Sequence, residues 1–136
     1  MELIKRNTEY GLRALLHMIG GKESDTFTAE ELADAADTST DFMHKIMRAL
    51  RDVGIVSSKT GPSGGFQLDR DPSGVSVLEI LEAVQGPFRV NQCVIGLDIC
   101  PTSEGCPLRP TWLEVQKTLE ENLGAISLKQ IADRAC

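Results

Sequence analysis

Apolar residues recur at every third or fourth position in two stretches of the first half of the chain. The first stretch predicts a helix from about Lys5 to Ile19, which would end at the pair Gly20-Gly21. The second begins after the turn at 37–39 and predicts a helix to about Val53. Its apolar stripe consists of Phe42, Met43, Ile46, Met47 and Leu50, and its other face carries Asp41, His44, Lys45, Arg48 and Arg51.

A shorter helix is expected between these two, over residues 29–36. The run from Thr28 to Glu31 fits a capping box, in which the Thr28 hydroxyl accepts a hydrogen bond from the Glu31 amide and the Glu31 carboxylate accepts one from the Thr28 amide. Two short helices joined by a tight turn, the second with a basic outer face, are typical of a helix-turn-helix. The second helix of that motif enters the major groove of DNA.

Residues 55–69 predict a β-hairpin that would form a wing beside the second helix. Strands are expected at 55–58 and 66–69, joined by a loop rich in Gly and Pro. Such a hairpin can bring backbone amides and Lys59 to DNA phosphates, because glycines without a Cβ let the chain approach closely. A second capping box at Ser76 predicts a helix to about Gln85, closed by Gly86-Pro87. The residues expected to contact DNA are Ser39, Thr40, Asp41, His44, Lys45, Arg48, Ser58, Lys59, Thr60, Gly61, Ser63 and Gly64.

A long amphipathic helix is expected from Leu108 to Leu123. Its apolar positions are Trp112, Val115, Leu119 and Leu123. The short helices of the first half already have one another to bury, so this stripe is expected to form a dimer interface with a second copy of the chain. A dimer would double a weak basic surface and match the two half-sites of a palindromic operator in double-stranded DNA.

The predicted architecture is mainly α-helical with a small β-wing. A winged helix-turn-helix DNA-binding domain would occupy residues 1–87, a cysteine loop 88–107, and the dimerisation helix with a C-terminal tail 108–136. No apolar run approaches the roughly eighteen residues of a membrane span, and no targeting segment is recognisable, so we expect a cytoplasmic protein. The net charge of -6 argues against a general nucleic-acid binder, but residues 38–70 form a modest basic island.

Three of the four cysteines, Cys93, Cys100 and Cys106, fall within fourteen residues in a stretch broken by Gly and Pro. Thiolates bind metals, and three thiolates on one loop can face a single centre. The spacing lacks the Cys-x-x-Cys pairs of most zinc sites, which favours an iron–sulfur cluster over zinc or a thiol sensor without metal. Cys136, at the chain end, is interpreted as a bystander.

The run from Val56 to Phe66, VSSKTGPSGGF, resembles the wing signature of the IscR/NsrR family of bacterial winged-helix transcription regulators. With the helix-turn-helix pattern and the cysteine loop, the resemblance covers nearly the whole chain. It implies a homodimer that binds DNA and carries an iron–sulfur cluster on Cys93, Cys100 and Cys106.

The fourth ligand departs from one branch of that family. In the iron–sulfur-assembly regulators a His three residues after the third cysteine completes a [2Fe-2S] site, but Arg109 stands here, and its protonated guanidinium cannot bind metal. The nitric-oxide-sensing branch takes a carboxylate from the partner's N-terminal helix to complete a [4Fe-4S] cluster, and Glu9 matches that place. Asp98 is the second candidate. The resemblance therefore favours [4Fe-4S] over [2Fe-2S], although the first gap has six residues where the family more often has five.

Three functions agree with these patterns. The favoured one is a homodimeric repressor that senses cluster status, redox state or nitric oxide. The alternatives are a cluster-free repressor whose thiols sense oxidation directly, and an iron–sulfur carrier or assembly protein on a winged-helix scaffold. His44, where the assembly regulators often carry Glu, predicts a different operator preference. An enzyme is not expected, because no nucleophile motif accompanies His17 or His44.

Overall fold

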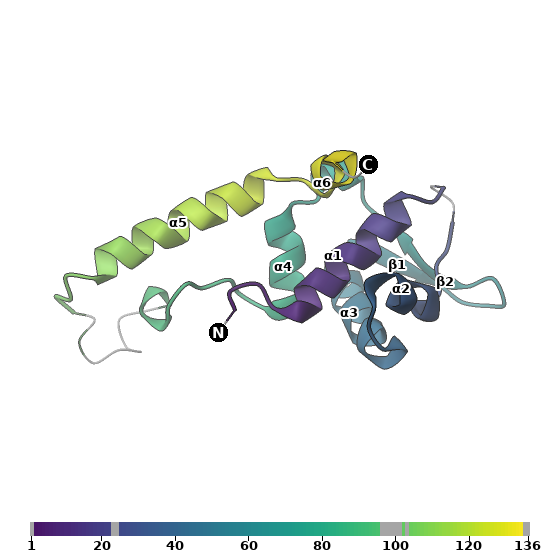
Figure 1. The fold of residues 1–136 in the computed structure, drawn as a ribbon, viewed down its shortest axis with the longest axis horizontal. Helices are drawn as coiled ribbons and strands as arrows, with labels where there is room; N and C mark the ends of the chain where they lie inside the picture. The colour runs from purple at the N-terminus through teal and green to yellow at the C-terminus, as the bar shows by residue number, and fades with distance from the viewer. Residues whose placement is uncertain (1, 23–24, 96–101, 103, 135–136) are drawn as a thin grey trace.

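Three helices and a hairpin make up the first half of the molecule (Figure 1). The computed structural model describes residues 2–22, 25–95, 102 and 104–134. Helices α1 (Arg6–Ile19), α2 (Ala29–Ala36) and α3 (Thr40–Asp52) are followed by the antiparallel strands β1 (Val56–Lys59) and β2 (Gly65–Leu68). The mainly α-helical fold with a small β-wing is thereby confirmed.

The ends of α2 and α3 follow from local hydrogen bonds. The Glu31 amide donates to the Thr28 hydroxyl at 3.1 Å, and the Thr28 amide donates to the Glu31 carboxylate at 3.3 Å, so the expected capping box is present. Asp37 adopts a left-handed conformation with φ of 61° and ends α2. Two residues later the Ser39 hydroxyl accepts from the Phe42 amide and starts α3.

The core lies between α1, α2, α3 and α4 (Val77–Gln85). The apolar stripe predicted for α3 faces it, since Met43, Ile46, Met47 and Leu50 are all buried. They pack with Leu15 of α1 and with residues of α2 and α4 in one cluster. Each such side chain stabilises the fold by about 1.5–3 kcal/mol through removal from water, so the core holds α3 rigidly on its inner face. Its outer face is left for contacts with other molecules.

The wing differs from the prediction by one residue in each strand. Ile55 was expected to begin the first strand, but its side chain is fully buried and its amide donates to the Leu50 carbonyl at 3.0 Å, so it belongs to the turn that ends α3. Gly54, with φ of 77°, makes that turn possible. A bridge not foreseen from the sequence joins Phe27 to Phe66, whose amides and carbonyls exchange hydrogen bonds of 2.8 and 2.7 Å.

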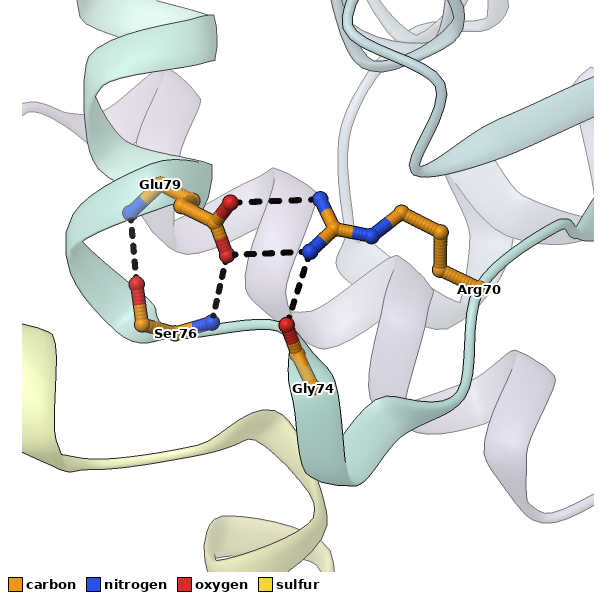
Figure 2. Close-up of polar contacts among 4 residues, drawn as sticks. All are labelled: Arg70, Gly74, Ser76 and Glu79. Carbon is orange, nitrogen blue, oxygen red and sulfur yellow. Dashed lines mark hydrogen bonds and ion pairs between the residues drawn. The ribbon is translucent and has the colours of Figure 1, made fainter.

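A polar cluster fastens the end of the wing to α4 (Figure 2). The Arg70 guanidinium donates to the Glu79 carboxylate at 3.2 Å and to the Gly74 carbonyl at 2.7 Å. Glu79 also accepts from the Ser76 amide at 3.0 Å, within the second predicted capping box. The short 3-10 helix η1 (Pro72–Gly74) lies between the two. The orientation of the wing is therefore coupled to the start of α4.

The C-terminal part forms two helices. The long helix α5 (Arg109–Ala125) extends away from the winged helix-turn-helix, and α6 (Leu128–Arg134) returns to it (Figure 1). The sequence analysis had assigned no helix to residues beyond the long one. Leu128 is fully buried in the core, and its amide donates to the Val75 carbonyl at 2.8 Å. Among the described residues, no helix is long and apolar enough to cross a membrane.

Candidate nucleic-acid interface and cysteine loop

A groove of about 420 Å³ lies between the outer face of α3, the start of α2 and the wing. Thr40 and His44 form its α3 wall, and Ser58, Lys59, Gly64 and Phe66 form its wing wall. The groove thus brings together residues that the sequence analysis had assigned separately to the recognition helix and the wing. Phe66 was not among the predicted contact residues.

The outer face of α3 presents the predicted DNA-contacting side chains to solvent. Thr40, Asp41, His44, Lys45 and Arg48 are exposed, whereas the Ser39 hydroxyl is already engaged in capping α3. One basic residue of this face is tied to the wing instead, because the Arg51 guanidinium donates to the Ser58 hydroxyl at 3.3 Å. That bond joins α3 to β1 across the edge of the groove.

The wing presents Lys59, Thr60, Gly61 and Ser63 to solvent, with Gly64 half-buried beneath them. The tip is closed by a turn in which the Gly64 amide donates to the Gly61 carbonyl at 2.9 Å. The Ser63 carbonyl accepts from the Thr26 hydroxyl at 2.9 Å, so the wing is held to the segment before α2.

The charged residues that line the groove are Lys59 and Glu30, and Lys45 and Arg48 are exposed on α3. No described carboxylate lies within ion-pair distance of Lys45, Arg48 or Lys59, so these cations are available to external anions. Glu30 and Asp41, which are exposed beside them, oppose that field. A surface with this mixture of charges can position a DNA duplex through a few phosphate contacts. It is less suited to binding any polyanion.

Two of the three clustered cysteines lie at one hollow of about 210 Å³. Cys93 belongs to the 3-10 helix η2 (Gln92–Val94) and Cys106 lies just before α5, and both are half-buried free thiols. Trp112 and Arg109 complete the walls. Cys100, Asp98 and Cys136 lie outside the described residues. Within the described part of the chain, no group of three His, Cys, Asp or Glu side chains is placed to hold a metal ion.

Arg109 has a role at this hollow that the sequence did not reveal. Its Nε donates to the Cys93 carbonyl at 3.2 Å, and its own amide donates to the Cys106 carbonyl at 3.3 Å. The residue that stands in place of a His ligand therefore joins the two limbs of the cysteine loop.

Glu9, the candidate fourth ligand, lies on the exposed face of α1. The start of that helix is held firmly, because the side-chain Oε1 of Gln85 accepts from the Thr8 hydroxyl at 2.7 Å and from the Lys5 amide at 3.0 Å. Within one subunit, Glu9 is free to face solvent or a partner.

The four side chains predicted to mediate dimerisation lie on α5. Trp112, Leu119 and Leu123 are half-buried, and Val115 is 39% exposed. Leu108 and Leu113, at 58% and 37% exposed, add to the apolar surface of the protruding helix.

The chain is similar to known transcription regulators over most of its length. The Rrf2 family model, described as an iron-dependent transcriptional regulator, matches residues 4–134. The rrf2-like HTH-type transcriptional regulator of Rhodobacter capsulatus is 31% identical over 121 residues, which cover 83% of this chain and 81% of that protein. The HTH-type transcriptional regulator IscR of Xenorhabdus nematophila is 25% identical over 122 residues, covering 90% and 74%.

Solved structures share the fold. CymR, the global cysteine regulator of B. subtilis, superposes with a TM-score of 0.79 at 20% identity over the whole of both chains. IscR of T. potens superposes with a TM-score of 0.74 at 22% identity, covering 98% of this chain and 88% of that one. The resemblance to IscR-type winged-helix regulators is confirmed, and the relatives are regulators and not enzymes. With the family model spanning almost the whole chain and a helix-turn-helix and wing meeting at one groove, this protein belongs to the Rrf2 family of transcriptional regulators.

Proposed function

We propose that the protein is a homodimeric repressor that binds a palindromic operator and senses the state of an iron–sulfur cluster, the redox state or nitric oxide. The observation that carries the DNA-binding half of this proposal is that α3 and the wing meet at one groove, lined by Lys59, with Lys45 and Arg48 exposed on α3. None of these three cations has a described carboxylate partner. In this proposal α3 enters the major groove, and the wing lies along the backbone.

Dimerisation would proceed through the apolar stripe of α5. The exposure of Val115, Leu113 and Leu108, and the extension of α5 away from the winged helix-turn-helix, support an interface there (Figure 1). A two-fold dimer places two recognition helices on one face of DNA, and their separation must match the half-site spacing. A change in the seating of α5 would therefore alter operator affinity without changing any residue that contacts DNA.

The donors at the cysteine loop fit an iron–sulfur cluster. Two half-buried thiols lie at one hollow, and thiolate is the usual ligand of such clusters. We propose that Cys93, Cys100 and Cys106 hold the cluster, that Glu9 of the partner subunit is the fourth ligand, and that the type is [4Fe-4S]. The cluster would supply reactivity toward oxidants or nitric oxide, and the chain would supply the attachment of the loop to α5.

The alternative of a cluster-free thiol repressor has one specific observation in its favour. Cys93 and Cys106 border the same hollow, so oxidation of one to a sulfenic acid could be followed by disulfide formation with the other. The carrier alternative has no such support, because a carrier has no use for a groove with free cations.

The cluster is tested by anaerobic purification followed by an absorption spectrum and by iron and sulfide assays. Alanine at Cys93, Cys100 or Cys106 should remove the cluster, whereas the control Cys136→Ala should not. Protein that holds zinc or no metal, but loses DNA binding reversibly on oxidation, would establish the thiol repressor instead.

DNA binding is tested by selection from a random duplex pool in each cluster state. Arg48→Ala should weaken binding to all selected sites and lower the slope of log affinity against log salt by about 1, because one phosphate contact is lost. Lys117→Ala is the matched control, since Lys117 on α5 is 77% exposed and pairs only with Glu121 among the described residues. A pool without an enriched palindrome would refute the proposed regulation.

A further inference from the structure

Gln116 is the only buried residue of α5, all of which the structure describes, and it is 6% exposed. An amide at the single buried position of a helix is unusual, because a carboxamide removed from water must find hydrogen-bond partners. Burial of an apolar side chain at this position would cost less free energy than burial of a carboxamide, so the hydrogen-bond partners of Gln116 indicate its role.

Two of the three contacts of the Gln116 carboxamide fix the chain that leads into the cysteine loop, and the third reaches that chain through Glu120. Its oxygen accepts from the Val90 amide at 2.8 Å, and its nitrogen donates to the Phe88 carbonyl at 2.7 Å. The same nitrogen donates to the Glu120 carboxylate at 2.6 Å, and Glu120 in turn pairs with Arg89 at 3.6 Å. Residues 88–90 are thus bonded to α5 in both donor and acceptor directions and cannot slide along it without breaking both backbone bonds.

Arg109 fixes the same limb of the loop nearer the cysteines. Arg109 lies two turns of α5 before Gln116, and its Nε donates to the Cys93 carbonyl. Its amide donates to the carbonyl of Cys106, which lies just before the helix. Figure 1 shows α5 and the segment from α4 to η2 extending to the same side of the molecule. The segment that contains Cys93 is hydrogen-bonded to α5, and Cys106 is hydrogen-bonded to the first residue of that helix. Helix α5 therefore fixes the position of Cys93 relative to Cys106.

We propose that Gln116 and Arg109 are positioning residues that set the separation of Cys93 and Cys106 at their common hollow. Arg109 lines the hollow but cannot be a metal ligand, because its guanidinium stays protonated, and Gln116 is not among the lining residues. The relevance of these two residues to sensing rests on the proposed function. The positions of Cys93 and Cys106 that they set do not depend on a bound cluster.

The test measures how easily the two thiols are bridged. In a Cys100→Ser, Cys136→Ser background, the reduced and metal-free protein is treated with dibromobimane. Each of the two thiols displaces one bromide ion from the reagent and forms a thioether, and the product becomes fluorescent when both have reacted. Monobromobimane, which alkylates each thiol singly, gives the intrinsic reactivity. The ratio of the two rates reports the separation of the thiols, whereas a loss of stability alone would move the unfolding midpoint and not this ratio.

Gln116→Met keeps the length of the side chain and removes all three polar contacts. It should lower the bridging ratio roughly tenfold, because effective concentration falls steeply when two reacting groups are displaced. Arg109→Lys keeps the charge beside the thiols but loses the Nε donor, and it should lower the ratio in the same direction. Gln130→Met is the matched control, since the Gln130 side chain accepts from the Ser127 amide at 2.8 Å in α6, away from the cysteine loop.

A bridging ratio for Gln116→Met equal to that of Gln130→Met would overturn the proposal. If Gln116→Met does not fold, as judged by circular dichroism, Arg109→Lys decides alone, and an unchanged ratio overturns it. Anaerobic loading of the chain with all its cysteines then separates the two proposals. If the parent chain takes up no iron, the proposed cluster is refuted but the bridging result is unaffected. If neither Gln116→Met nor Arg109→Lys alters the cluster spectrum or the bridging ratio, the positioning role is refuted.

Discussion

His44 and Phe66 pack edge to face, with ring centroids 6.3 Å apart and planes inclined at 66°. His44 lies on the exposed face of α3, and Phe66 belongs to β2. Because the Phe66 backbone also pairs with Phe27, the wing gives the imidazole a fixed wall. A side chain held in this way reaches a DNA base with less loss of conformational entropy than a free one.

The first prediction concerns base reading by His44. His44→Ala should change the preferred base at one position of each half-site, with a change of about 1–3 kcal/mol in discrimination, while the salt dependence stays the same. Selection from a random duplex pool followed by competition binding measures both.

His17→Ala supplies the control for this change. His17 packs on Phe27 in a similar way, with centroids 5.5 Å apart, but on α1 and away from the groove. An identical selected motif for His44→Ala and the parent chain would exclude a reading role for His44.

The second prediction concerns the base of the wing. Gly65 has φ of 152°, and a Cβ there would lie 2.5 Å from the Phe27 carbonyl oxygen. Gly65→Ala should therefore break the bridge between Phe27 and Phe66 and lower the free energy of unfolding by about 1–3 kcal/mol. Urea unfolding gives the stability, and operator binding should weaken with it.

Gly74→Ala is the matched change, because a Cβ at Gly74 meets nothing within 4 Å. The two variants should differ clearly in unfolding midpoint. Equal midpoints would show that the close approach of β2 to Phe27 is not needed for the wing.

The third prediction is a pH dependence of stability from Glu79. The Ser76 amide, and after it the Arg70 guanidinium, hold the pKa of Glu79 below its ordinary range, while partial burial acts in the opposite direction. A carboxyl whose folded-state pKa is lowered stabilises the fold above its unfolded pKa, about 4.3, and this contribution is lost as the pH falls through the folded value.

Glu79→Gln should therefore lower the free energy of unfolding at pH 7, and the difference from the parent should vanish as the pH falls below about 4. The side chains of Arg70 and Glu79 are 36% and 45% exposed, so solvent screening limits the difference to about 0.5–1 kcal/mol. Urea unfolding across this pH range measures it. Glu82→Gln, an exposed change on the same helix, is the matched control. A difference for Glu79→Gln that stays constant across the pH range would contradict the role of its charge.

The fourth prediction separates the two candidates for the fourth cluster ligand. If Glu9 of the partner subunit completes the site, Glu9→Ala should still fold and dimerise through α5 but hold its cluster weakly or with an altered spectrum. Asp98→Ala should then retain the parent spectrum under anaerobic conditions. The reverse pattern, with Asp98→Ala destroying the spectrum and Glu9→Ala leaving spectrum and DNA response unchanged, would place the ligand within the loop.

Helix boundaries were predictable where the signals that set them are a few residues apart. The capping box at Thr28 and Glu31 and the turn at Asp37 define α2 as Ala29–Ala36, as the sequence analysis expected. The buried stripe of α3 was predictable for the same reason, because a helical repeat places Met43, Met47 and Leu50 on one side whatever the helix packs against. The presence of a wing, and the three cysteines of the loop, were also readable directly.

Contacts between distant residues were decided by the tertiary structure. Ile55 lies outside the first strand because its side chain is buried in the core. Phe27 pairs with the wing through backbone hydrogen bonds, which leave no periodic pattern in the sequence. The seven-residue helix α6 is too short for a clear repeat, and it depends on the burial of Leu128 in the core cluster with residues of α1, α2 and α3. Arg109 and Gln116 looked like ordinary polar residues of an amphipathic helix, since a hydrogen bond to a carbonyl 16 or 28 residues away is specified by packing and not by spacing along the chain.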